Sequence, residues 1–151
     1  MITAGDLFPD FSVLDQEGTI HTLSALKGHR LILFCYPKDD TSGCTQEACE
    51  FRDTLPQFGD VKVLGISPDP VKSHSKFAGK HSLPYPLLSD PDQALLLPLG
   101  VWVEKSMYGR KYMGVERTTF LVDAEGKVER IWTKVKPAGH AADVLKALRA
   151  I

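Results

Sequence analysis

Two cysteines, Cys44 and Cys49, stand five residues apart, directly after a loop rich in proline, aspartate, threonine, serine and glycine. Two thiols at this spacing permit three interpretations: a metal site, side chains that only pack, or a pair that forms a disulfide after part of the chain moves. Zinc sites typically have about two to four residues between paired ligands and need further ligands. The histidines are scattered and show no matching pair: His21, His29, His74, His81 and His140. The lack of further ligands at a matching spacing therefore disfavours a metal site and leaves packing and redox chemistry open.

A helix is predicted over residues 42–55, ended by Pro56. If Thr41 or Ser42 caps this helix, Cys44 falls in its first turn. Free backbone N–H groups and the positive end of the helix dipole lie there, and both favour a thiolate over a thiol. An apolar stripe follows Cys44 at helical spacing, formed by Ala48, Phe51 and Leu55. We therefore expect Cys44 to point partly inward, at the rim of the core.

A regular helix would hold Cys44 and Cys49 apart. Five residues correspond to a rotation of about 140° and a rise of about 7.5 Å, which separates the two Cα atoms by about 8.6 Å. A disulfide requires Cα atoms within roughly 4.4–6.8 Å of each other. If these cysteines pair, at least one helical turn must unwind, and helix ends are regions of low stability where such unwinding is expected.

Length and composition narrow the classes of protein. The chain has 151 residues, which suits a single domain over residues 1–151. Hydrophobic residues make up 43%, charged residues 25%, and the formal charge is −1, so neither nucleic acid nor a membrane is expected as a partner. The start, "MITAGDLFPD", lacks the features of a secretory signal. Three cysteines are few for a secreted domain, so we expect a reducing, cytoplasmic location, where a cysteine pair is seldom structural.

Strand patterns surround the cysteine pair. Residues 30–36, "RLILFCY", are apolar on both alternating faces, as expected of a central strand, and Cys35 is expected to be a small core residue of that strand. Residues 61–67 predict a second central strand. Residues 11–23 and 118–132 each read as two short strands around a glycine-containing turn, which predicts two hairpins.

Helix patterns alternate with these strands. Asp69 and Pro70, a cap followed by a good first-turn residue, predict a helix within residues 69–81. Asp90 and Pro91 repeat this signal and predict another helix. The last twelve residues predict an amphipathic helix whose apolar face is Ala142, Leu145, Leu148 and Ile151. This order of strands and helices favours an α/β fold around a mixed sheet.

The segment "YPKDDTSGC" resembles the active-site pattern of the peroxiredoxins, here formed by Pro37, Thr41 and Cys44. A further cysteine five residues later is similar to the peroxiredoxin Q branch, also called the bacterioferritin comigratory protein group. The segments "ACEFRD", "VLGISPD", "LLSD" and "GVWVEKSMYGRKYMGVERTTFLVD" resemble that branch in order and spacing, so the likeness covers nearly the entire chain. It implies a thioredoxin-like fold, a mixed central sheet flanked by helices, with an N-terminal β-hairpin extension.

The resemblance also implies roles for five residues. Cys44 would be the peroxidatic cysteine, which attacks a peroxide oxygen, and Cys49 the resolving cysteine. Thr41 would place its hydroxyl near the thiolate and the incoming peroxide. Arg117 would supply a guanidinium from a distant strand, and Pro37 would shield the pocket from water. A permanent cation suits this chemistry, because the leaving oxygen develops negative charge.

Each of these residues also has a purely structural interpretation. Arg117 would then form a surface ion pair with a carboxylate such as Glu116. Thr41 would only cap the helix, and Pro37 would only break the strand before the loop. Ser42 stands where many family members have proline, and its hydroxyl is an alternative helix cap.

The implied activity is that of a thiol-dependent peroxidase that reduces hydrogen peroxide and organic hydroperoxides. Cys44 would become a sulfenic acid, Cys49 would resolve it as an intramolecular disulfide, and thioredoxin or a similar dithiol would reduce that disulfide. No cofactor or metal is expected, and the resemblance suggests a monomer. A peroxide sensor, or a relay that passes the oxidation to a partner protein, is the alternative. The preferred peroxide stays open, because four side chains suit an apolar approach or ordinary packing: Leu83, Tyr85, Trp102 and Met107.

Overall fold

The strand that leads to the two cysteines lies inside the sheet. The computed structural model describes residues 2–150, and β3 (Leu31–Cys35) is buried at all of its positions. β3 pairs in parallel with β4 (Lys62–Ser67) and antiparallel with β8 (Thr118–Val122). The prediction of two central strands is confirmed, the two are neighbours in the sheet, and the antiparallel partner makes the sheet mixed.

Seven strands form this sheet, in the order β2-β1-β5-β4-β3-β8-β9. The remaining four are β1 (Ser12–Leu14), β2 (Ile20–Thr22), β5 (Leu87–Ser89) and β9 (Val128–Trp132). β1 and β2 form the predicted N-terminal hairpin, which joins the sheet where Leu14 pairs with Ser89 of β5. β8 and β9 form the second predicted hairpin. The predicted α/β architecture is therefore confirmed.

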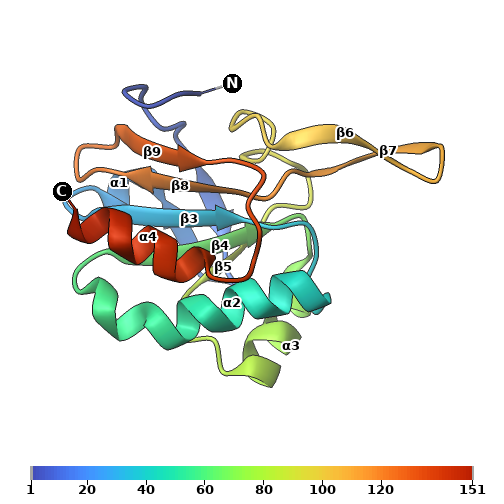
Figure 1. Cartoon of the computed structure of the whole chain (residues 1–151), viewed down its shortest axis with the longest axis horizontal. Helices are drawn as coiled ribbons and strands as arrows, with labels where there is room; N and C mark the ends of the chain where they lie inside the picture. Colours follow the sequence, from blue (N-terminus) through green and yellow to red (C-terminus); the bar gives the residue numbers. More distant parts are fainter. Residues whose placement is uncertain (1, 151) are drawn as a thin grey trace.

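Three helices cover one face of the sheet (Figure 1): α2 (Ser42–Thr54), α3 (Val71–His81) and α4 (His140–Arg149). Their buried side chains pack with those of β3 in one apolar cluster, whose members include Phe34, Phe51, Phe77 and Val144. A second cluster on the opposite face contains side chains of the N-terminal segment and of the short α1 (Leu23–Leu26). The sheet is thus covered on both faces, as its apolar strands require.

The helix that carries both cysteines begins where the sequence predicts and ends one residue earlier. After Thr54 the chain continues as a 3-10 turn, η1 (Leu55–Phe58), with Pro56 near its start. Proline cannot donate the backbone hydrogen bond of a continuing α-helix, so the change of helix type at this point has a local cause. Cys44 and Cys49 therefore lie on one uninterrupted helix.

The prediction that Asp69 caps α3 was wrong. Pro70 is the N-cap residue, without a side-chain cap hydrogen bond, and the helix begins at Val71. The Asp69 carboxylate instead accepts hydrogen bonds from Ser67 Oγ at 2.6 Å and from the backbone N–H of Asp39 at 2.8 Å. Asp69 therefore bonds to a distant part of the chain and not to the helix that it precedes. Its bond to the Asp39 N–H connects the end of β4 to the loop that follows β3.

The helix predicted after Asp90 is also absent, because residues 90–100 form turns. The Asp90 carboxylate accepts hydrogen bonds from three consecutive backbone N–H groups, those of residues 94–96, at 2.8–2.9 Å. Gln93 has a left-handed φ of 57°, which interrupts any helix there. Asp90 therefore accepts backbone hydrogen bonds as a helix cap does, but the segment that it caps is a series of turns.

The C-terminal helix is confirmed, and its buried face differs from the predicted one. Ala141, Val144, Leu145 and Leu148 are buried, whereas Ala142 is exposed. Ile151 lies outside the described residues. Across residues 2–150, no helix has the length and apolar character needed to cross a membrane.

A second, two-stranded sheet projects from the body of the molecule (Figure 1). It consists of β6 (Trp102–Met107) and β7 (Arg110–Val115). Tyr108 and Gly109 at its tip have left-handed φ angles of 53° and 76°, as a tight hairpin turn requires. No strand or helix was predicted for this segment from the sequence. β7 ends just before Arg117, so this hairpin directly precedes the arginine of the candidate site.

The packing of β4 predicts a cost for any side chain at Gly65. A Cβ atom there would lie 2.8 Å from Phe34 Cζ and 3.0 Å from Leu87 Cδ2. We expect Gly65→Ala to lower the free energy of unfolding by about 1–3 kcal/mol, because buried rings would have to shift. Gly79→Ala is the matched control, since nothing lies within 4 Å of a Cβ there, on the exposed face of α3. Urea unfolding measures both, and equal stability of the two variants would contradict the packing argument.

Candidate active site

Cys44 lies in the first turn of α2 and is 1% exposed. Its Sγ accepts a hydrogen bond of 3.1 Å from Nη2 of Arg117. Arg117 lies in the short connection between β7 and β8, so it comes from beside a distant strand and not from within one. The guanidinium thus sets a permanent positive charge directly against the sulfur. The structure thus brings together two of the predicted site residues, 73 positions apart in the chain.

The second acidic partner of Arg117 is Glu47, which the sequence analysis missed. Glu47 is 1% exposed, and its Oε1 accepts a hydrogen bond of 2.7 Å from Arg117 Nη1. The structural alternative, a surface ion pair with a carboxylate such as Glu116, is therefore not what forms: the carboxylate partner of Arg117 is the buried Glu47. Glu47 follows Cys44 by three residues, so the two side chains share a helix face. A carboxylate at this spacing from a reactive cysteine, on the apolar face of a helix, was the available signal.

Burial sets the electrostatics of this group of three. It raises the pKa of Glu47 to about 7, and the nearby Arg117 only partly opposes that effect. Burial by itself would lower the pKa of Arg117, but Glu47 and Cys44 reverse the effect and hold that pKa above its ordinary value. Oε2 of Glu47 is buried and has no hydrogen-bond partner among the described residues. Glu47 is therefore poised between acid and carboxylate near neutral pH, beside a cation that stays charged.

Gly43 leaves room for the guanidinium. A Cβ atom at this position would lie 3.3 Å from Pro137 Cγ and 3.4 Å from Arg117 Nη2. The first distance is tighter than ordinary van der Waals contact and the second is at its lower limit, so a side chain here would press on Pro137 and lie directly against the arginine that contacts Cys44. The absence of a side chain at Gly43 therefore leaves the space that the Arg117 guanidinium occupies.

The structure places Thr41 at the expected position but orients its side chain differently. Thr41 is the N-cap residue of α2, yet its hydroxyl makes no cap hydrogen bond and donates to the carbonyl of Lys38 at 2.9 Å. Ser42 is the first helical residue, so it is not the cap either. Of the two candidate caps, Thr41 thus holds the N-cap position, and neither residue supplies a side-chain cap hydrogen bond. While the Thr41 hydroxyl donates to the Lys38 carbonyl, its lone pairs stay available to accept a hydrogen bond.

Pro37 follows β3 after one residue and is half-buried at the start of the active-site loop. Its fixed φ and missing N–H suit the point at which the chain leaves the sheet. Asp40, three residues on, has a left-handed φ of 59°. The loop therefore turns sharply just before α2, and the role of Pro37 against a substrate stays a prediction.

All three thiols are free. Cys49 is half-buried and lies on the same continuous helix as Cys44, as the spacing argument requires. Cys35 is fully buried in β3, and burial raises its pKa well above the ordinary value. Its assignment as a core residue is confirmed. Of the three, Cys35 is the least suited to react as a thiolate.

The four apolar side chains considered for a substrate approach lie in the core and on the surface. Leu83 and Tyr85 are buried, Trp102 is half-buried, and Met107 is exposed. The hydroxyl of Tyr85 donates a hydrogen bond of 2.7 Å to the backbone carbonyl of Ala48, between the two active-site cysteines. Ordinary packing therefore accounts for Leu83 and Tyr85, and Tyr85 also holds the middle of α2.

Comparison with known sequences gives a consistent result. The model of the AhpC/TSA family matches residues 4–131. Peroxiredoxin Bcp of Xanthomonas campestris is 50% identical over 135 residues, which cover 88% of this chain and 84% of that protein. Peroxiredoxin Bcp of Bacillus subtilis is 43% identical over 150 residues, which cover 98% of this chain and 96% of that protein.

Solved structures agree with the sequences. A cysteine mutant of Xylella fastidiosa PrxQ has a TM-score of 0.94 at 38% identity, covering 99% of this chain and 97% of that one. The Xanthomonas campestris bacterioferritin comigratory protein, described with an alkyl peroxide reduction activity, has a TM-score of 0.89 at 46% identity, covering 93% and 90%. These likenesses confirm the thioredoxin-like fold that the sequence predicts. Taken with the thiol that Arg117 holds at the start of α2, they show that this chain belongs to the AhpC/TSA family, as a peroxidase of its Bcp or peroxiredoxin Q branch.

Proposed function

We propose that this peroxidase reduces hydrogen peroxide and organic hydroperoxides with Cys44, resolves the product with Cys49, and is recycled by thioredoxin or a similar dithiol. The observation that carries the proposal is the 3.1 Å contact between Arg117 Nη2 and Cys44 Sγ at the N-terminus of α2. The alkyl peroxide activity named for the Xanthomonas relative supports organic hydroperoxides as substrates. The cycle needs only thiols and a peroxide, so it requires no cofactor.

The first step oxidises Cys44. The thiolate attacks the terminal peroxide oxygen, the O–O bond breaks, and the sulfur becomes a sulfenic acid. The leaving oxygen departs with the bonding electron pair and takes a proton, which gives water or an alcohol. Arg117 donates hydrogen bonds at the place where negative charge moves from sulfur to oxygen. Thr41 and Pro37 complete the proposed pocket, with the lone pairs of the Thr41 hydroxyl available to accept a hydrogen bond from the substrate.

The second step joins the two cysteines. The Cys49 thiol attacks the Cys44 sulfur, water leaves, and a disulfide forms within one chain. Because α2 runs unbroken from Ser42 to Thr54, its first turns must unwind before the sulfurs meet. An external dithiol then reduces the disulfide by exchange. A disulfide closed within one chain needs no second copy, which supports a monomer, and reduction by a dithiol suits a cytoplasmic location.

Substitution of single cysteines tests the assigned roles. Cys44→Ser is expected to abolish peroxide turnover, and Cys49→Ser to leave one oxidation per protein without dithiol-driven cycling. Cys35→Ala is the matched control and should keep turnover, because Cys35 is sealed in β3. A hydroperoxide assay coupled to thioredoxin and its reductase measures all three, and mass spectrometry locates the disulfide. Full cycling of Cys49→Ser would refute the resolving role, and a trapped mixed disulfide without turnover would indicate an oxidant relay.

Loss of the guanidinium tests the electrostatic part of the mechanism. Arg117→Met is expected to lower the second-order rate constant of Cys44 oxidation by about 10²–10³, the usual cost of removing a donor aimed at developing charge. Arg117→Lys should recover only part of it, because an ammonium cannot hold Glu47 and Cys44 with two parallel donors. Arg130→Met is the control, since Arg130 lies over Trp132, away from the site. Stopped-flow oxidation in a Cys49→Ser background gives the rate, and an unchanged rate in Arg117→Met would exclude the proposed role.

The buried carboxyl predicts a dependence of stability on pH. The pKa of Glu47 is raised from 4.5 to about 7, so the folded protein binds its proton more tightly than the unfolded chain does. Stability must then fall as pH rises from about 4.5 to about 7, by at most about 3 kcal/mol. Glu47→Gln removes this proton and should lose that part of the decline. Urea unfolding of both proteins at pH 5 and pH 8 measures the difference, and identical pH profiles would contradict the prediction.

A further inference from the structure

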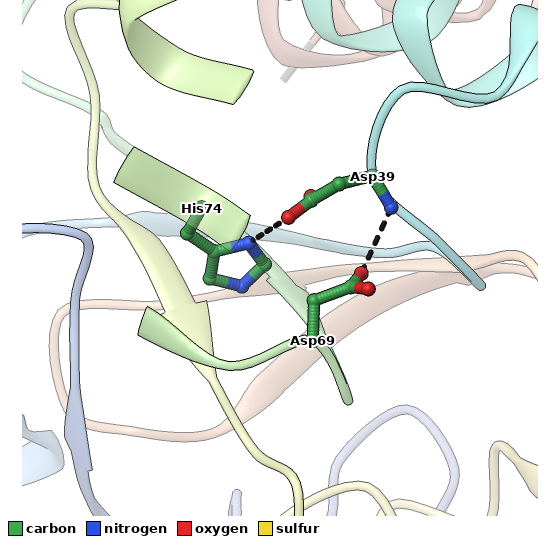
Figure 2. Close-up of side chains that lie close together, drawn as sticks. All are labelled: Asp39, Asp69 and His74. Atoms are coloured by element: carbon green, nitrogen blue, oxygen red, sulfur yellow. Dashed lines mark hydrogen bonds and ion pairs between the residues drawn. The ribbon is translucent and has the colours of Figure 1, made fainter. Parts of the chain in front are cut away.

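The loop that leads into α2 is fastened to α3 by one buried aspartate, Asp39 (Figure 2). Its Oδ1 accepts a hydrogen bond from Tyr36 Oη at 2.6 Å. Its Oδ2 accepts one from Ser73 Oγ at 2.8 Å and lies 2.6 Å from His74 Nδ1. Its backbone N–H donates to Asp69 Oδ2 at 2.8 Å. Four groups from three parts of the chain therefore hold one loop residue.

The pair of Asp39 and His74 is sealed from solvent, with side chains 3% and 0% exposed. Nε2 of His74 lies 2.8 Å from the carbonyl of Leu88, which can only accept, so Nε2 carries a hydrogen. A second hydrogen must lie between Nδ1 and the Asp39 carboxylate. Tyr36 and Ser73 donate to the two oxygens of the same carboxylate, so both oxygens of Asp39 are held inside the protein. The nitrogen and oxygen atoms that a metal ion would need are occupied by these bonds.

The contacts weaken abruptly beyond this point. Among residues 2–150, the side-chain partners of Asp40 are the exposed Lys80, at 3.1 Å, and His81, at 3.5 Å. Its left-handed φ of 59° is costly for a residue other than glycine. α2 then starts without a side-chain cap and without an acidic residue in its first turn, and it has a glycine at its second position. A firmly held loop is thus followed immediately by a helix start that lacks local capping and is held from outside the helix by the contact of Arg117 with Cys44.

We propose that Asp39 and His74 are positioning residues that fix the loop in both redox forms, so that the unwinding of α2 starts at Ser42 and pivots on Asp40. The proposal rests on the proposed reaction cycle, because only the pairing of Cys44 with Cys49 requires the helix to unwind. The anchor keeps Cys44 beside Arg117 before oxidation. During resolution it confines the rearrangement to the residues after the loop.

Amide hydrogen exchange of the unaltered protein, followed by NMR, tests the anchor directly. In the thiol form, the Asp39 N–H should exchange at least about tenfold more slowly than the N–H of Thr45, which bonds Thr41 in the first turn of α2. In the peroxide-generated disulfide form, Thr45 should lose its protection and Asp39 should keep it. Loss of protection at Asp39 in the disulfide form, or faster exchange at Asp39 than at Thr45 in the thiol form, overturns the proposal.

Two variants test the effect on the chemistry. Asp39→Ala combined with His74→Leu removes both groups without leaving a buried charge, and should lower the rate of Cys44 oxidation about tenfold or more, since small misplacements of reacting groups are costly. Asp39→Asn is the conservative variant. Its amide can donate to a neutral His74 and accept from Tyr36, so it should keep the rate within about threefold. The rate constant of the second step, in which Cys49 attacks the oxidised Cys44, does not depend on the peroxide concentration. It should not fall in either variant.

The pattern separates a positioning role from a merely structural one. General destabilisation would lower the melting temperature and disturb both steps, whereas loss of the anchor slows oxidation and spares resolution. If the double variant oxidises at the parent rate, or if Asp39→Asn is as slow as the double variant, the proposal fails. If the parent protein does not react with peroxide or forms no Cys44–Cys49 disulfide, the proposed function fails instead. The exchange comparison in the thiol form still decides whether Asp39 anchors the loop.

Discussion

The guanidinium of Arg117 donates hydrogen bonds to two acidic groups on one face of α2, Cys44 and Glu47, and the geometry of the site depends on these two bonds. Arg117 meets Cys44 and Glu47 because the two follow each other by three residues along α2. The register of the sheet brings the arginine to this place. Cys35 at the end of β3 pairs with Thr118 at the start of β8, so the loop leaving one strand and the residue preceding the other lie side by side. A shift in that register would separate the thiol from its cation.

The sequence was sufficient where local patterns decide the structure. The buried strand β3, the neighbouring β4, both predicted hairpins and the extent of α2 follow from apolar periodicity and from Pro56. The motif residues Cys44 and Arg117 were predicted from a resemblance and meet in the structure, whereas no local pattern joins residues so far apart. The packing of Cys35 was correctly predicted from its position in an apolar strand.

The errors share one physical cause, the choice of partner by a short polar side chain. Asp69 precedes a proline in the manner of a cap, but its carboxylate finds Ser67 and the Asp39 backbone. Thr41 occupies the cap position and still turns to Lys38. Glu47 escaped notice because a glutamate in a helix normally faces solvent, and only tertiary packing shows that it is buried. Short polar side chains can form several hydrogen bonds of similar energy with nearby groups. Which of these bonds forms depends on the tertiary structure and not on the local sequence.

The uninterrupted helix between the two active-site cysteines has a kinetic consequence for the proposed cycle. After Cys44 has been oxidised, it must wait for the first turns of α2 to open before Cys49 arrives, and the hydrogen bond of Tyr85 to the Ala48 carbonyl, between the two cysteines, delays that opening. During the wait a second peroxide molecule can convert the sulfenic acid to a sulfinic acid, which dithiols do not reverse. The strength of a few contacts along α2 therefore sets the peroxide concentration at which the catalyst inactivates itself.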